Sequence, residues 1–154
     1  MKSAALLASI ACAFLSLAVH AAPGPARAEI ADDTLRIEND VLSLTWSTAD
    51  NRLRPAAIHD KLSGRRIDAI GELFTLALAD GRTLRASQLD LVEGPRVEGV
   101  LPEPDALRQA DQFGGQCVTA SLAGLEGRLR IHWEAMLRDD SHYVRQIVTL
   151  QATK

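Results

Sequence analysis

The sequence predicts an all-β fold, an antiparallel β-sandwich spanning residues 29–154. Apolar and polar residues alternate along most of this range. Such alternation is typical of strands, because successive side chains point to opposite faces of a sheet. Turn-forming pairs such as Asp80-Gly81 separate the alternating segments. No segment shows sustained helical periodicity, and about nine short strands in a chain of this length fit a sandwich.

The first half of the domain divides into four short strands joined by polar turns. Leu42, Leu44 and Trp46 share one face of the second strand. Pro55 lacks a backbone donor, which places the third strand at a sheet edge or at a bulge. The strands are expected at residues 34–37, 41–46, 53–58 and 65–67, with turns at 38–40 and 49–51 and a loop at 59–64.

The middle of the chain is less regular. Residues 73–78 suit a strand or a helix, and the Asp-Gly pair after them favours a hairpin whose returning strand covers 83–92. A further short strand is expected at 96–100. Residues 101–115 form either a loop long enough to be functional or mobile, or a turn or two of helix at 104–110.

The clearest unit comes last. Leu129 to Ala135 alternates strictly, which predicts the first strand of a long antiparallel hairpin with one solvated face. The strands are expected at 116–122, 129–137 and 143–150, with a turn at 138–142. Because the last strand runs almost to residue 154, we expect an incomplete or accessory domain.

The N-terminus has the layout of a secretory signal peptide, predicted over residues 1–28. A basic start precedes an apolar run from Ala4 to Val19, which is shorter than the roughly 20 residues of a bilayer span. Two small-x-small cleavage signals follow, Val19-His20-Ala21 and Ala26-Arg27-Ala28. We therefore expect an exported protein, periplasmic or extracellular, without a stable membrane span after cleavage. A retained membrane anchor is the less favoured alternative.

Charge and cysteine content exclude several classes of function. Residues 29–154 carry 15 basic and 20 acidic side chains, a net charge of −5, whereas nucleic-acid binding usually needs a basic patch. Cys117 is the only cysteine in this range, so neither an internal disulfide nor a thiolate metal cluster can form there. We expect no cofactor and no nucleic-acid partner.

Several segments resemble the N-terminal β-sandwich of bacterial α-galactosidase-like glycoside hydrolases, family 36 and relatives. The similarity rests on the opening strand Asn39–Trp46, the turn Asp50–Leu53 and the loop Ile58–Gly64. It extends to the late hairpin from Trp133 to Leu150, with its Tyr-Val-Arg-Gln step at 143–146. The resemblance covers roughly residues 34–152 and implies a galactose-mutarotase-like supersandwich.

In the resembled family the catalytic carboxylates lie on a following (β/α)8 barrel. Such a barrel needs about 250 residues, and the 154 residues here contain none of it. No catalytic residue can therefore be carried over. The resemblance implies an accessory domain that packs on the barrel and borders the sugar site.

The residues themselves offer few catalytic candidates. His132 and Glu134 share a strand face, and His59-Asp60 is a second His–carboxylate pair, but ordinary surface polarity explains both. Cys117 lies in an alternating strand, which favours a buried, inert thiol. Two acid pairs, Asp32-Asp33 and Asp139-Asp140, fit turns better than a glycosidase dyad. The histidines after residue 28 are His59, His132 and His142, and their spacing suggests no metal site.

Three further features have a structural and a functional interpretation. Trp46 and Trp133 could stack on sugars, but their apolar strand faces favour core packing. Gly114-Gly115 lacks the spacing of a phosphate loop and suggests the end of a flexible loop. Arg65-Arg66 is an isolated basic pair, expected in solvent.

Three hypotheses follow. The first is an exported, non-catalytic N-terminal domain or fragment of an α-galactosidase-like hydrolase, in carbohydrate metabolism. Its partner would be a catalytic barrel, or a second copy held through an exposed apolar face. The second is a self-standing periplasmic module that binds carbohydrate or protein. The third is a small exported structural domain without a ligand. No substrate-binding residue can be named from the sequence.

Overall fold

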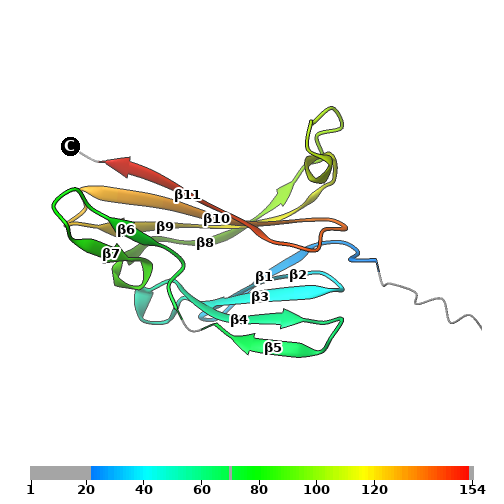
Figure 1. The fold of residues 1–154 in the computed structure, drawn as a ribbon, viewed down its shortest axis with the longest axis horizontal. Helices are drawn as coiled ribbons and strands as arrows, with labels where there is room; N and C mark the ends of the chain where they lie inside the picture. The colour runs from blue at the N-terminus through cyan, green and yellow to red at the C-terminus, as the bar shows by residue number, and fades with distance from the viewer. Residues whose placement is uncertain (1–21, 70, 153–154) are drawn as a thin grey trace, which may run out of the picture.

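The computed structural model describes residues 22–69 and 71–152 and shows two stacked antiparallel sheets with a small hairpin at one end (Figure 1). The all-β sandwich predicted from the alternation is thus confirmed. The first sheet has the order β1-β2-β3-β4-β5 and the second the order β11-β10-β9-β8, while β6 and β7 pair with each other.

The strands of the first sheet follow one another along the chain. They are β1 (Arg27–Ala31), β2 (Thr34–Glu38), β3 (Leu42–Ser47), β4 (Arg54–Asp60) and β5 (Arg65–Asp68). The hairpin comprises β6 (Thr75–Ala77) and β7 (Thr83–Arg85). The second sheet comprises β8 (Asp90–Val100), β9 (Gly115–Gly124), β10 (Leu129–Arg138) and β11 (Arg145–Ala152). Three short 3-10 turns, η1 (Ala49–Asn51), η2 (Ala86–Gln88) and η3 (Gln109–Gln112), complete the elements.

The core lies between the two sheets and is built from the predicted alternation. β1 and β2 lie against β8, β9 and β10. Trp46 on β3 and Trp133 on β10 are both buried and meet edge to face at its centre. The other buried core residues are Ala26, Leu35, Ile37, Leu53, Leu89, Val118, Ala120, Leu122, Ile131, Ala135 and Leu137. Burial of this apolar surface is the main term that stabilises the sandwich.

Proline and glycine shift some of the predicted boundaries. β4 lies between β3 and β5, so of the two alternatives offered for Pro55 the bulge is correct, and the register shifts opposite it between Thr45 and Trp46. The predicted returning strand at 83–92 is too long: β7 pairs with β6 as expected but ends at Arg85, and η2 separates it from the start of β8. β8 then continues through Gly94-Pro95 to Val100 with two register shifts, so 96–100 is no separate strand.

Two other segments differ from expectation. The predicted loop at 59–64 begins later, because β4 continues through His59 and Asp60. A helical turn does occur in the 101–115 segment, but η3 starts at Gln109, where 104–110 was expected.

The predicted signal peptide lies mostly on residues 1–21, outside the described part of the chain. The residues that follow belong to the sandwich. Pro23 and Ala26 are buried, and β1 starts at Arg27, so the ordered domain begins before residue 29.

Candidate functional site

One side of the sandwich is less well covered than the other. Because β1 and β2 lie against β8 to β10, the strands β4, β5 and β11 border the opposite side. Cross-strand neighbours in an antiparallel sheet share a face. Leu44 pairs with the buried core residue Ile37 and packs against the core. Ile58 pairs with Leu44 and Ile67 with Ile58, so all three face the second sheet. Ile58 and Ile67 are nevertheless 45% and 58% exposed.

The second sheet shows the same feature along its β11 edge. Val148 pairs with Trp133 and Leu150 with Ile131, and both partners are fully buried core residues. Val148 and Leu150 therefore face inward, yet they are 37% and 51% exposed. We call the side bordered by β4, β5 and β11 the open side of the sandwich.

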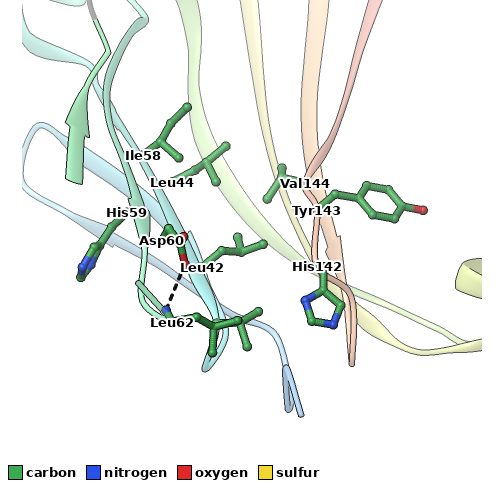
Figure 2. Close-up of a pocket in the computed structure, with 10 residues that line it drawn as sticks. Leu42, Leu44, Ile58, His59, Asp60, Leu62, His142, Tyr143 and Val144 are labelled. Atoms are coloured by element: carbon green, nitrogen blue, oxygen red, sulfur yellow. Dashed lines mark hydrogen bonds between the residues drawn. The ribbon is translucent and has the colours of Figure 1, made fainter. Parts of the chain in front are cut away.

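A groove of about 380 Å³ lies on the open side between β3, β4 and the segment that leads into β11. Figure 2 shows the side chains of Leu42, Leu44 and Ile58 facing Val144 across it. Leu62 closes one end. Its walls are mainly aliphatic, which suits an apolar occupant.

The polar residues around this groove do not converge on it. Figure 2 shows His59 and Tyr143 directed away from its centre. The Asp60 carboxylate accepts the hydroxyl and backbone N–H of Ser63 and, at 3.0 Å, the backbone N–H of Leu62. These hydrogen bonds, led by the one from the Ser63 hydroxyl, lower the pKa of Asp60 below its usual range. Asp60 therefore fixes the β4–β5 turn.

Both tryptophans belong to the core. Trp46 is 2% exposed and Trp133 is fully buried, with its Nε1 donating to Gln146 Oε1 at 3.1 Å. Core packing is therefore the correct interpretation, and neither ring forms a sugar-stacking platform on the surface.

The other catalytic candidates lie on strands β9 and β10 of the second sheet. His132 Nε2 and Glu134 Oε1 lie 3.1 Å apart on the outer face of β10, as their spacing predicted. Cys117 is buried on β9, and burial, aided by Glu134 and Glu98, raises the pKa of its thiol to about 11. Because the thiolate is the reactive form, this cysteine is a poor nucleophile at neutral pH.

The acid pairs have structural positions. Asp32-Asp33 forms the turn between β1 and β2, as expected for turn acids. In the β10–β11 turn, Asp139 Oδ1 accepts the backbone N–H of Ala26 at 2.8 Å. Asp140 Oδ1 accepts the N–H of Gly24 at 3.1 Å. The second pair therefore holds the N-terminal segment against the sandwich.

A buried arginine was not identified from the sequence. The Arg138 side chain is 8% exposed, and its Nη1 donates to the carbonyls of Leu101 and Phe113 at 3.0 and 2.7 Å. Its Nη2 lies 3.4 Å from Asp111 Oδ1. Arg138 thereby ties both ends of the 101–114 segment to β10. The only sequence signal was its position at the end of a strongly alternating strand.

Gly115 is no flexible loop end, because it opens β9 against the end of β10. A Cβ there would clash with the Leu137 carbonyl oxygen, so the close backbone approach requires glycine. Arg65 and Arg66 are exposed on β5, and Arg66 Nε lies 3.4 Å from Asp68. This basic pair is solvated, as predicted.

Within residues 22–69 and 71–152, no group of three or more His, Cys, Asp or Glu side chains is placed to hold a metal ion. Among the same residues, no helix has the length and apolar character needed to cross a membrane.

Comparison with known proteins gave no match to a family model, to a curated protein or to a solved structure. The resemblance to α-galactosidase-like N-terminal domains therefore stays a prediction.

Proposed function

We propose that this chain is an exported, non-catalytic β-sandwich module that docks against a second protein through its open side. The observation that carries the proposal is the exposure of inward-facing aliphatic residues on both sheets: Ile58, Ile67, Val148 and Leu150. Such residues are normally covered in a sandwich, and exposed apolar surface of this kind commonly marks protein interaction sites.

The edge strands of the two sheets also indicate the open side as the docking surface. Natural edge strands are usually protected by short length, charge, proline or bulges. β1 and β5 are short and charged, and β8 combines Pro95 with two register shifts. β11 pairs with β10 over eight residues without a shift, and its only charged residue is Arg145. The least protected edge therefore borders the open side.

The absence of a catalytic role is supported by the positions of the candidates. His132 and Glu134 lie on the outer face of β10, Cys117 is buried with a raised pKa, and the acid pairs serve turns.

The docking partner has two possible identities. The resemblance suggests that it is the barrel of an α-galactosidase-like hydrolase. In the other case, the chain is a self-standing periplasmic module that binds another protein.

Binding of the dye ANS, which reports exposed apolar surface, tests the proposal on the native protein. Replacing Ile58 or Leu150 by lysine should lower ANS fluorescence, because each change places a charge on the open side. Gln151→Lys is the matched control, since Gln151 neighbours Leu150 on β11 but faces outward. Equal ANS binding by all three variants and the unaltered protein would refute the open side as a docking surface.

Carbohydrate binding is the alternative, and one observation favours it. Tyr143 borders the groove and is 51% exposed, and its ring, which is directed away from the groove centre, could stack on a sugar ring outside the groove. Thermal unfolding with a panel of galactosides and other glycans tests this alternative, since a ligand that binds only the folded state raises its stability. A rise with one glycan that Tyr143→Ala abolishes would favour the sugar-binding module over protein docking.

A further inference from the structure

We propose that export removes residues 1–21 and retains residues 22–28, so that the mature protein begins at Ala22. This inference rests on the proposed export. The sequence offers two cleavage signals, one ending at Ala21 and one ending at Ala28. The structure distinguishes them, because the residues between the two sites form part of the sandwich.

The first argument is strand pairing. β1 pairs with β2 along its full length, and its first two residues, Arg27 and Ala28, lie opposite Glu38 and Ile37. The Arg27 guanidinium also donates to Asp40 Oδ1 at 2.7 Å. Cleavage after Ala28 would remove these two residues and leave a three-residue strand at the edge of the first sheet.

The second argument is the set of hydrogen bonds that hold the preceding residues. The Pro23 carbonyl accepts the N–H of Asp40 at 2.8 Å. Gly24 forms two hydrogen bonds with Asp140. Its N–H donates to Asp140 Oδ1 at 3.1 Å, and its carbonyl accepts the Asp140 N–H at 3.0 Å. The Ala26 N–H donates to Asp139 Oδ1. Residues 23–26 thus join the β2–β3 turn to the β10–β11 turn.

The third argument is burial and backbone shape. Ala26 is 7% exposed and belongs to the core, and Pro23 is also buried. Gly24 has φ +67°, and a Cβ there would lie 2.5 Å from Asp40 Oδ2. Glycine is the residue that adopts a positive φ and this close approach to a carboxylate without strain. Such a specific requirement is expected in a folded segment that remains in the mature protein. Ala22, by contrast, is exposed, so cleavage before it leaves every one of these contacts in place.

The direct test is to express the whole chain with its own N-terminus in a Gram-negative host and to determine the N-terminus of the periplasmic product by mass spectrometry. We expect a product that begins at Ala22. A product that begins at Glu29 would overturn this inference while leaving export intact. A full-length product that stays with the cytoplasm or the membrane would overturn the proposed export itself.

A glycine pair provides an independent readout on the same exported protein. Gly24→Ala should lower the Tm by about 5 °C, because alanine is strained at positive φ and crowds Asp40. Gly99→Ala is the control, since no neighbouring atom lies within 4 Å of its Cβ position. An unchanged Tm for Gly24→Ala would contradict the retention of residues 22–28.

Discussion

The indole of Trp46 meets the indole of Trp133 edge to face, with ring centroids 5.1 Å apart and ring planes inclined by 74°. Each ring comes from a different sheet, so the pair forms a direct link across the core. Edge-to-face geometry is favourable for aromatic rings because the positive edge of one meets the negative face of the other. These are the only two tryptophans in the sequence, and both are buried in this contact between the sheets.

Removing one ring should therefore destabilise the whole domain. Trp133→Ala is expected to lower the free energy of unfolding by about 3–5 kcal/mol, because it leaves a large cavity between the sheets. Tyr143→Ala, at a half-exposed aromatic residue, should cost about 0.5 kcal/mol or less. Urea denaturation followed by circular dichroism measures both. Similar losses for the two variants would contradict the central position of the Trp46–Trp133 pair.

Arg138 should control the order of the 101–114 segment. Arg138→Ala is expected to cost about 3 kcal/mol, because it removes a buried charge that pairs with Asp111 and leaves two carbonyls without their donor. It should also speed hydrogen exchange across residues 101–114. Arg108→Ala, at an exposed arginine beside the same Asp111, should leave both properties nearly unchanged. Unaltered exchange in the Arg138 variant would show that other contacts hold this segment.

Cys117 should make stability depend on alkaline pH. Its thiol has a pKa of about 11 when folded, against about 8.5 in an unfolded chain. Below about pH 8.5 the thiol is protonated in both states and has no effect. Between about 8.5 and 11 only the unfolded state loses its proton, so the folded state loses relative stability as pH rises. The Cys117→Ala variant should lose less stability over this range in denaturant titrations. Parallel pH profiles for the two proteins would indicate a normal thiol pKa.

The fold could be predicted from the sequence where alternation was strict. Leu129 to Ala135 gave the inner face of β10 correctly, and Asp80-Gly81 gave the β6–β7 hairpin. Prediction failed where the backbone is irregular. The Gly94-Pro95 pair suggested a break, but an edge strand accommodates it through register shifts. β1 was missed because its first two residues also belong to a cleavage signal, and only their pairing with β2 shows that they are folded.

The candidate site was less predictable than the fold. The strand register places Ile58, Ile67 and Leu150 on inward faces, and neither this register nor the lack of cover by the opposite sheet can be read from local sequence patterns. The same limit applies to Arg138, whose burial depends on carbonyl groups contributed by residues 101 and 113. For Trp46 and Trp133, in contrast, the sequence correctly favoured core packing over sugar stacking, because the apolar residues on the same strand faces are visible in the sequence.

The most direct test of the docking proposal is sedimentation velocity of the purified protein over a wide range of concentrations. An uncovered open side should drive concentration-dependent association of the isolated chain, because no partner covers Ile58 and Leu150. The Ile58→Lys/Leu150→Lys double variant should remain monomeric, whereas Gln151→Lys should associate like the unaltered protein. A monodisperse monomer at every concentration for the unaltered chain would contradict a docking role for the open side.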